Sequence, residues 1–398
     1  MKPKSTRLFF IDAMRAWAIL MMLQGHFIDG LLDTIFRNPE NPIYTIWLYF
    51  RGITAPVFFT VSGFIFTYLL VRVPQTGWNN PRVKKGIRRG LQLLIIGYLL
   101  RLNIFGLFEG KIYEGFYLVD VLHCIGLSIL AIIGVYVLTE KWKKFAFPLV
   151  LIAITLVLFL FEPLYKQWSF AFLPSGLANY FTKVNGSVFT IIPWLGYTAF
   201  GGFLSLLFTR FKDSKHLYPA AIVLSVISGI ELIFFSSDGF IKLYELTGID
   251  LFYIIQLNNY LFIRLGDVFL VFAVFMLLRS LLTNTTILKI GQNTLSIYVI
   301  HFVILYGSFT GLGLYRFFYH ELNPAVAISG AVAFMVACTA LALWYDKNES
   351  GVKSRITFAI NSIGVQVVIV SRMASLLIRE LLVRIKMVLY RLFGFVQN

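Results

Sequence analysis

The chain has 398 residues, of which 58% are hydrophobic and 14% are charged, and its mean hydropathy is +0.79. A soluble domain cannot bury so much apolar surface, and successive apolar runs are long enough to cross a bilayer, so we predict a polytopic helical membrane protein. The formal net charge of +16 does not indicate a nucleic-acid partner, because the basic residues are distributed along the chain as membrane topology requires.

We predict an all-α transmembrane helix bundle with about ten spans. The approximate spans are 8–34, 43–71, 87–106, 116–138, 145–162, 187–209, 217–236, 259–282, 288–314 and 324–345. With the N-terminus in the cytoplasm, the inner loops and termini hold 25 of the 35 Lys and Arg residues, the outer loops hold 6, and 4 lie within spans or at their ends. This asymmetry predicts that both termini are cytoplasmic.

The N-terminal segment MKPKSTR and the apolar run that follows it have the general pattern of a signal peptide. The run is too long, however, it is interrupted by Asp12 and Arg15, and it lacks a small-residue cleavage site, so we interpret it as an uncleaved first span. The two cysteines, Cys124 and Cys338, both lie in predicted spans. They provide neither a disulfide framework nor a metal cluster, and we expect no bound metal.

We predict one membrane domain over residues 1–345 and a cytoplasmic tail over residues 346–398. The two long outer loops, 162–186 and 236–256, are rich in aromatic residues, and we expect them to fold onto the membrane face where a substrate site would be built. Basic residues share one face of a predicted helix in the tail, which is typical of an amphipathic helix on an anionic inner leaflet; they are Arg372, Arg379, Arg384, Lys386 and Arg391. An eleventh span at 356–371 would place these charges outside, so we favour ten spans and leave eleven open.

The first span, FIDAMRAWAILMMLQGHFID, contains Asp12, Arg15, His26 and Asp29. An ionisable residue at the bilayer centre costs about 3 kcal/mol on insertion scales, so such residues need a partner or a function. Arg15 and His26 share one helix face about 16 Å apart along the axis, and each has an aspartate one turn away. The His–Asp pair on the outer side suits general-base catalysis, and the deeper arginine can hold an anion or a polar chain.

Several further ionisable residues are predicted at a similar depth in the outer half of the bundle: Arg51, Arg101, Asp120, His123, Arg264, Asp267 and His301. Simpler interpretations stay open, because the Asp12–Arg15 pair can be a neutral salt bridge, the histidines can be packing residues, and the arginines can extend to the interface. The common depth of so many titratable groups favours a polar site.

The stretch FIDAMRAWAILMMLQGHF resembles the opening span of membrane-integral acyltransferases. Two related groups share it: the acyltransferase-3 family, which O-acylates bacterial polysaccharides, and bacterial relatives of heparan-α-glucosaminide N-acetyltransferase. The spacing of Arg15 and His26 matches the acyltransferase-3 motif, and RGITAPVFFTVSGFIFTYLL resembles the second span of both groups. DVLHCIGLSIL, IIPWLGYTAFGGFL and IGQNTLSIYVIHFVIL are closer to the heparan-type group. The resemblance covers roughly residues 5–345.

The sequence also departs from these families. Ala16 follows Arg15, at a position where these families commonly have glycine. The stretch NPIYTIWLYF has no histidine, whereas the lysosomal heparan-α-glucosaminide N-acetyltransferase has its proposed acetyl-accepting histidine in the matching segment. We therefore do not expect a covalent acetyl-histidine at that position, and His26 is the preferred catalytic residue by the acyltransferase-3 pattern.

The resemblance implies transfer of an acetyl or other short acyl group from cytoplasmic acyl-CoA, with acetyl-CoA as donor substrate and no permanently bound cofactor, to a saccharide hydroxyl or amine outside. In this scheme His26 is the general base and is oriented by Asp29 or Asp33. His123 and His301 are further catalytic candidates. Donor binding or oxyanion stabilisation is assigned to basic residues, namely Arg15, Arg51, Arg264 and the inner-loop residues Arg88 and Arg89, whose alternative explanation is the ordinary positive-inside bias.

The expected location is a bacterial inner membrane, with lipids, acyl-CoA and the acceptor as partners and with a homodimer left open. The main alternative function is a transporter or flippase for a glycan or a lipid-linked substrate, in which the same charges line a path, and a third is a scaffold or sensor. Paired inverted repeats with broken helices would favour transport, whereas a donor tunnel that ends at His26 would favour an enzyme. The acceptor, the acyl chain, the choice of O- or N-acylation and the use of a covalent intermediate are left open.

Overall fold

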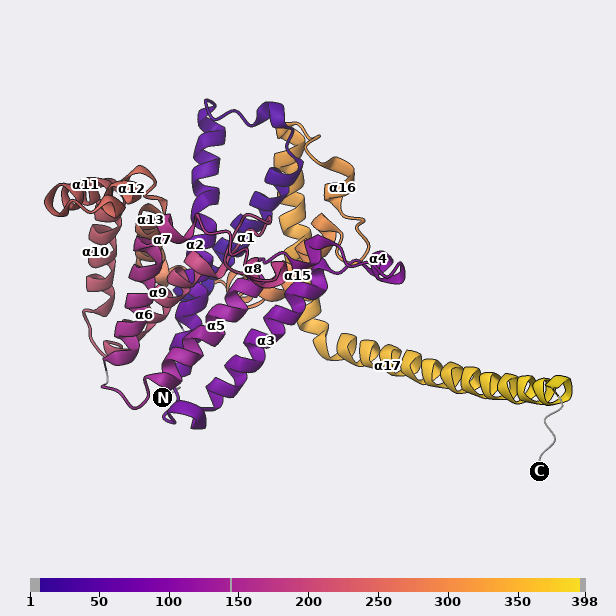
Figure 1. Cartoon of the computed structure of the whole chain (residues 1–398). Coiled ribbons are helices and arrows are strands. Elements are labelled where there is room, and N and C mark those ends of the chain that lie inside the picture. Colours follow the sequence, from indigo (N-terminus) through magenta and orange to yellow (C-terminus); the bar gives the residue numbers. More distant parts are fainter. Residues whose placement is uncertain (1–7, 144, 394–398) are drawn as a thin grey trace. The chain divides into compact units, whose positions relative to one another are not determined.

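The computed structural model describes residues 8–143 and 145–393, and its regular elements in these ranges are helices (Figure 1). This confirms the predicted all-α class. The longer helices are α1 (Phe9–Leu31), α2 (Pro42–Val71), α3 (Pro81–Arg101), α5 (Val121–Leu138), α6 (Ala146–Leu160), α9 (Ile191–Arg210), α10 (Leu217–Ile230), α11 (Ser236–Thr247), α13 (Tyr260–Leu277), α15 (Thr294–Tyr306) and α17 (Pro324–Phe393). The short ones are α4 (Ile104–Phe108), α7 (Glu162–Tyr165), α8 (Ser175–Ala178), α12 (Asp250–Leu257), α14 (Thr285–Gln292) and α16 (Leu314–Phe318).

Several helices begin at an asparagine whose side chain caps the first free backbone N–H groups. The Asn41 side chain accepts from Ile43 N and Tyr44 N at the start of α2, and the Asn80 side chain accepts from Arg82 N at the start of α3. Both helices have proline at their first position, where the missing N–H has no helical partner to lose. The local sequence therefore sets these two boundaries.

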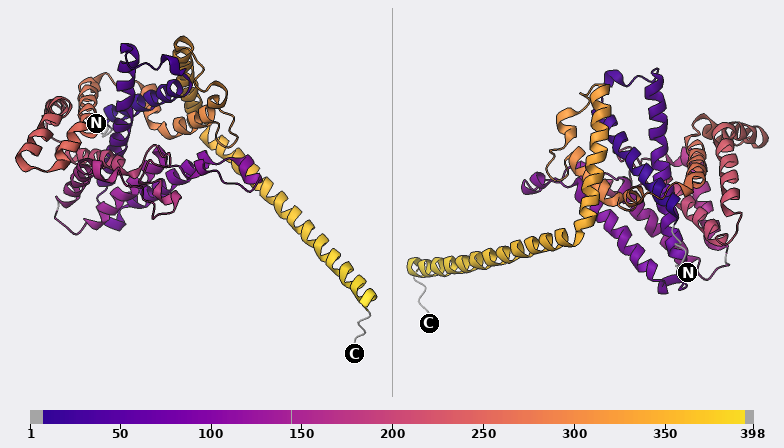
Figure 2. Two further views of the ribbon diagram at one scale, coloured as in Figure 1. Left: turned by 45° about the horizontal axis from the view of Figure 1, so that its top comes forward. Right: turned by 180° about the vertical axis from the view of Figure 1, so that it is seen from behind.

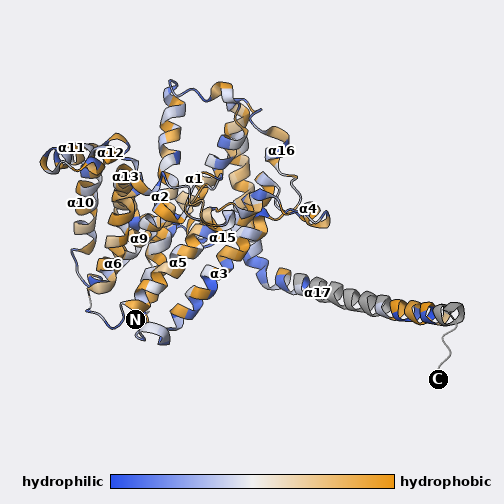
Figure 3. Ribbon diagram, viewed as in Figure 1, coloured by the Kyte–Doolittle hydropathy of each residue, from blue (hydrophilic) through white to orange (hydrophobic). Residues whose placement is uncertain are grey.

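Six helical segments are long and apolar enough to cross a membrane, and a bent pair of helices brings the number to seven within the described residues. These segments include α2, α5, α9 and α13, and Figure 3 shows hydrophobic residues, in orange, along them. The predicted spans 8–34, 87–106 and 145–162 correspond to α1, α3 and α6, which are more charged or shorter. The total of ten spans therefore stays a prediction.

The helices α2 and α9 are in backbone contact at the centre of the first compact unit, Met1–Ala342. A Cβ built on Gly63 would lie 1.9 Å from the Thr198 carbonyl oxygen, and one on Gly201 would lie 1.8 Å from the Thr60 carbonyl oxygen. Only glycine permits this approach on either helix. Because lipid is as apolar as leucine, such close packing of small residues is the main source of helix association in a bilayer.

The chain bends within the predicted span 288–314. Helices α14 and α15 meet at an angle of 70° around Asn293, and α15 ends at Tyr306. α14 packs tightly on α1, since a Cβ on Gly291 would lie 1.9 Å from the Asp12 carbonyl oxygen. Non-helical backbone at membrane depth is tolerated where it is buried in protein.

The two segments predicted as long outer loops are more ordered than the sequence predicts. The expected loop 236–256 is helical, because α10 continues through a π-helical turn, Glu231–Phe235, into α11 and then α12. The other predicted outer loop, 162–186, packs on the bundle: the Tyr180 hydroxyl lies 2.7 Å from the Tyr98 hydroxyl of α3, and the Tyr180 carbonyl oxygen accepts from Ile191 N at 2.7 Å. Its contact with a membrane face stays a prediction.

The second compact unit, Leu343–Asn398, contains most of α17, whose helical geometry is interrupted at Asn348. Figure 2 shows the part of α17 that follows this interruption as a long helix. Side chains 375–387 are exposed. The side chains of Arg372 and Arg391 lie outside the described residues, so the basic face and its contact with a lipid leaflet stay predictions.

Candidate active site

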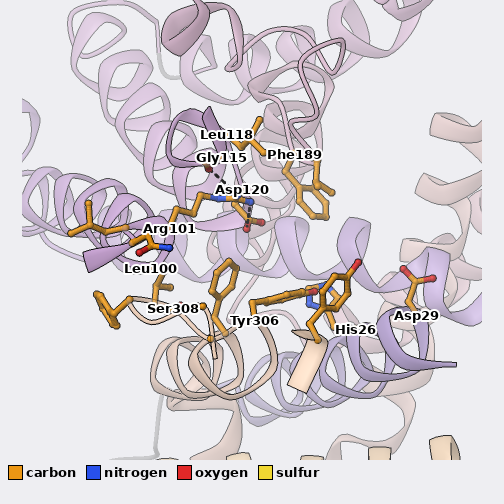
Figure 4. A pocket seen from close by; sticks show the side chains of 18 of the residues that line it. His26, Asp29, Leu100, Arg101, Gly115, Leu118, Asp120, Phe189, Tyr306 and Ser308 are labelled. Carbon is orange, nitrogen blue, oxygen red and sulfur yellow. Dashed lines mark hydrogen bonds and ion pairs between the residues drawn. The ribbon is translucent and has the colours of Figure 1, made fainter. Parts of the chain in front are cut away.

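A cavity of about 660 Å³ lies at the end of the bundle where α1, α3 and α15 end and α5 begins. Polar side chains of several elements converge in it (Figure 4). Its charged and aromatic lining consists of His26 and Asp29 from α1, Arg51 from α2, Arg101 from α3, Asp120 before α5, Phe302 and Tyr306 from α15, Phe189, Phe309, and Tyr315 from α16. Elements from both ends of the sequence are therefore needed to build it.

Two histidines meet at the wall of this cavity. His26 Nδ1 lies 3.2 Å from His301 Nε2, although the two residues are 275 positions apart in sequence. The opposite ring nitrogen of His301, Nδ1, faces the backbone carbonyl oxygen of Tyr298. His301 is fully buried, whereas His26 keeps some accessible surface and lines the cavity.

This geometry determines the tautomers of the neutral pair. A carbonyl oxygen only accepts hydrogen bonds, so His301 Nδ1 carries a proton and His301 Nε2 presents a lone pair. His26 Nδ1 then donates to His301 Nε2, and His26 Nε2 keeps the free lone pair. His26 is thus arranged as a proton acceptor whose orientation is fixed by a second histidine.

The carboxylates near His26 have other partners. Asp29 accepts from Arg51 at 2.6 Å and lies 3.9 Å from Arg37, and the Asp33 carboxylate caps a short 3-10 turn by accepting from Ile35 N at 3.0 Å. Within the described residues neither carboxylate makes a hydrogen bond to His26, so the orienting role of Asp29 or Asp33 stays a prediction that these contacts do not support. Asp29 instead fixes the guanidinium of Arg51 at the cavity wall.

A second ion pair lies in the same cavity. Arg101 at the end of α3 donates to Asp120 at 3.0 Å and to the carbonyl oxygen of Gly115 at 3.2 Å, and Figure 4 marks both interactions. Asp120 also caps α5 through Val121 N. The cavity therefore contains two arginines and two aspartates, and its fixed charges balance.

Two tyrosines, Tyr306 and Tyr315, also line the cavity at His26. The Tyr306 ring lies 6.2 Å from the His26 ring and 5.6 Å from the Tyr315 ring. Burial, together with a hydrogen bond to Tyr319, raises the pKa of Tyr315 to about 12. This hydroxyl stays protonated near neutral pH, so it can donate a hydrogen bond to a polar ligand.

A smaller cavity of about 290 Å³ adjoins the first one, and His26 and Arg51 line both. Its other lining is mostly apolar and includes Met21, Met22, Phe58, Phe59 and Trp194. Met22 precedes His26 by one helical turn, about 6 Å toward the start of α1. The imidazole of His26 therefore stands between a polar cavity and an apolar cavity that extends deeper into the bundle.

A family model described as an acyltransferase domain matches residues 8–344. The chain belongs to the acyltransferase-3 family. The search of curated proteins gave no match. The matched range contains every residue of the two cavities described above, and the membership identifies the chain as a membrane acyltransferase.

The acyltransferase-3 spacing of Arg15 and His26 places these residues in different environments. Arg15 donates to Thr294 Oγ1 at 3.1 Å and lies 3.7 Å from Asp12. It lines neither of the two cavities. Because Thr294 begins α15, Arg15 connects α1 to the bend between α14 and α15.

Two other predicted site residues lie away from these cavities. His123 is fully buried between Tyr98 and Tyr180, and its Nδ1 accepts from Asp120 N at 3.2 Å, so it serves the start of α5. Arg264 pairs with Asp267 at 2.9 Å and stacks on a tyrosine of α2. Neither residue lines the cavities at His26.

The basic cluster containing Arg88 and Arg89 lies near the start of α3 and is exposed. Arg101 lies at the other end of this helix, about 20 Å along the axis. The structure therefore does not bring Arg88 and Arg89 to the cavity, and CoA binding by this cluster stays a prediction. Within residues 8–143 and 145–393, no three His, Cys, Asp or Glu side chains gather as metal ligands.

Some lining residues received no role from the sequence. In the sequence, Arg101 and Asp120 are visible as charged residues at span ends. They are 19 positions apart, and no local sequence pattern indicates that they form an ion pair. The sequence around Tyr306, Ser308 and Tyr315 has the pattern of an ordinary membrane span followed by a loop, and it does not indicate that these residues line a cavity. Their recruitment depends on the break in the α14–α15 span, which the hydropathy pattern does not reveal.

Proposed function

We propose that the protein moves an acetyl or other short acyl group from cytoplasmic acyl-CoA to a saccharide hydroxyl or amine on the outer side of the membrane. The observation that supports this most directly is the position of His26, between a polar cavity and an apolar cavity, with its Nδ1 hydrogen-bonded to His301. Membership of the acyltransferase-3 family supports the reaction class.

In this proposal the apolar cavity receives the acyl end of the donor. Its methionine and phenylalanine side chains suit a thioester and a short acyl chain, which have few polar groups to satisfy. The polar cavity receives the acceptor. Its balanced ion pairs and tyrosine hydroxyls offer donors and acceptors to a polyhydroxy compound without selecting a net charge.

The reaction then proceeds in two proton transfers around one acyl transfer. His26 Nε2 takes the proton from the acceptor hydroxyl while the acceptor oxygen attacks the thioester carbonyl carbon. Collapse of the tetrahedral intermediate breaks the C–S bond, and the proton on Nε2 goes to the departing sulfur, giving the ester and free CoA. His301 accepts from His26 Nδ1–H throughout and stabilises the transient imidazolium.

Arg51 is the best-placed cation for the oxyanion. It lines both cavities, and Asp29 holds it at 2.6 Å. A fixed guanidinium next to the reacting carbonyl requires little reorganisation as negative charge develops on the oxygen. Arg264, the other candidate, is occupied by Asp267 and lines neither cavity.

The transport alternative predicts paired broken helices in two related halves. Among the described residues one broken pair is found, α14 with α15. This break positions His301 next to His26, so it already has a place in the enzymatic scheme.

The test uses purified protein in nanodiscs with labelled acetyl-CoA, and it measures free CoA and the labelled product on neutral oligosaccharides and on amino sugars. We expect His26→Ala to lower turnover by about 10²–10⁴-fold, as for loss of a general base. The matched control is His216→Ala, because His216 lies at an exposed turn before α10. Normal turnover in His26→Ala would refute the mechanism, and absence of acyl transfer from the wild type to every acceptor would refute the function.

A further inference from the structure

A second polar cavity, of about 600 Å³, adjoins the candidate active site. Lys183 lines this cavity and also lines the apolar cavity at His26, so the two are neighbours across this side chain. The other polar lining consists of Glu162, Tyr165, Lys166, Thr182, Thr190, Asn258 and Tyr260. The scheme proposed above gives this cavity no role.

The charges of this second cavity do not balance. Glu162, whose side chain is 8% exposed, pairs with Lys166 at 3.3 Å. The Lys183 ammonium makes no hydrogen bond or ion pair within the part of the chain that the structure describes. Two lysines and one glutamate line the cavity, so one positive charge remains in excess.

Lys183 is an exposed residue that lines the cavity, and it lies in the field of a second cation, Lys166. Partial desolvation and repulsion from Lys166 lower the pKa of Lys183, and Glu162 only partly opposes this. A bound anion would offset both effects, because it would supply the counter-charge that Lys183 lacks. By contrast, the arginines of the cavity at His26 already have Asp29 and Asp120 as partners.

The remaining lining suits a sugar ring. Tyr165 and Tyr260 provide aromatic surface, and the Tyr260 ring lies 5.9 Å from the Lys166 ammonium. The Glu162 carboxylate and the Asn258 amide can bond ring hydroxyls. A polar lining with aromatic faces and one unmatched cation selects a saccharide that carries negative charge.

We propose that this second cavity binds an anionic residue, a sugar carboxylate or sugar phosphate, of the same saccharide whose neighbouring residue is acylated at His26. Lys183 contacts the anion, and Glu162 contacts hydroxyl groups of the same residue. This inference rests on the proposed function, and it makes the acceptor an acidic glycan. It also explains why a cation without a partner lies beside the apolar cavity.

The experiment compares oligosaccharides that are identical except at one residue, which is glucose, glucuronate or glucose 6-phosphate, with that residue placed at successive positions. Acyl transfer is measured with labelled acetyl-CoA in phosphatidylcholine nanodiscs. We expect the acidic acceptors to have a KM about ten-fold lower than the neutral one, the size of effect typical of one charge-assisted hydrogen bond. Lys183→Gln should remove the preference, and Lys183→Arg should keep it. The matched control is Lys242→Gln, because Lys242 lies on α11 and lines none of the three cavities.

Calorimetric binding of the same compounds without donor separates this inference from the proposed function. A binding preference for the acidic compounds that Lys183→Gln removes, with melting temperature retained, supports the inference even if no acyl transfer occurs. Equal binding of neutral and acidic compounds by the wild type overturns it, as does a preference that survives in Lys183→Gln. Loss of the preference in nanodiscs containing phosphatidylglycerol would show that a lipid headgroup fills the cavity and would also overturn it.

Discussion

Replacing His301 tests the role of the histidine pair. In the wild type, His301 Nε2 lies 3.2 Å from His26 Nδ1 and accepts its hydrogen bond. His301→Ala removes this acceptor. The imidazolium that forms during the reaction loses one hydrogen bond to a charged group, worth about 1.5–3 kcal/mol. At about 1.4 kcal/mol for each factor of ten, we expect kcat to fall by about ten- to a hundred-fold. His26→Ala removes the base itself and should be more severe.

His301→Gln distinguishes positioning from direct catalysis. The amide oxygen of glutamine can accept from His26 Nδ1–H but cannot act as a base, so this variant should recover part of the lost kcat. KM for donor and acceptor should stay close to wild type in both variants, because the fully buried His301 does not line the cavities. The assay is steady-state transfer of labelled acetyl-CoA, with melting temperature as the folding control.

Two outcomes would refute this reasoning. Near-normal kcat in His301→Ala would show that the tautomer of His26 does not need His301. If His301→Ala and His301→Gln were as inactive as His26→Ala, His301 would itself carry the proton and the base would be assigned to the wrong helix. The same preparations would show whether the ring contact of 5.3 Å between the two histidines serves catalysis or only packing.

Three further predictions follow from other parts of the bundle. Arg15→Lys should partly lower both the melting temperature and the rate of acyl transfer, because lysine keeps the positive charge but lacks the planar guanidinium group. A variant indistinguishable from wild type in melting and kinetics would contradict this. Gly97→Ala should destabilise the fold by about 1–3 kcal/mol, because its Cβ would lie 2.6 Å from the buried His123 ring, and unchanged thermal melting in detergent would contradict this packing. Cysteines placed at Glu109 and Lys242 should react with an impermeant reagent from the outer side, and labelling from the cytoplasmic side would reverse the topology and put His26 on the donor side.

The sequence predicts those features that have a local or periodic cause. Apolar period and length predict α2, α9 and α13, whereas the predicted start of the third span at residue 87 misses the Asn80 cap and Pro81, where α3 begins. The repeat of 3.6 residues also places Asp12 beside Arg15, which the structure confirms at 3.7 Å.

The remaining features depend on contacts that no local pattern records. The spacing of three residues between His26 and Asp29 predicts a pair, yet Asp29 bonds Arg51 on the next helix at 2.6 Å. Arginine offers a charged partner for the carboxylate, whereas a neutral imidazole offers one donor that His301 already accepts. The choice between partners is therefore made by how α2 and α15 pack on α1.

The charges of α1 consequently fall into two groups with different causes. At the start of the helix, Asp12 and Arg15 lie where α14 packs on α1, and Arg15 bonds the first residue of α15. This group compensates for a broken span, where backbone and hydroxyl groups need partners inside the membrane. Near the end of the helix, His26 and Asp29 each meet a residue of another helix and line a cavity. The break that the first group stabilises also directs α15, and with it His301, to His26. The charges at one end of α1 therefore help to set the geometry of the candidate site at the other end.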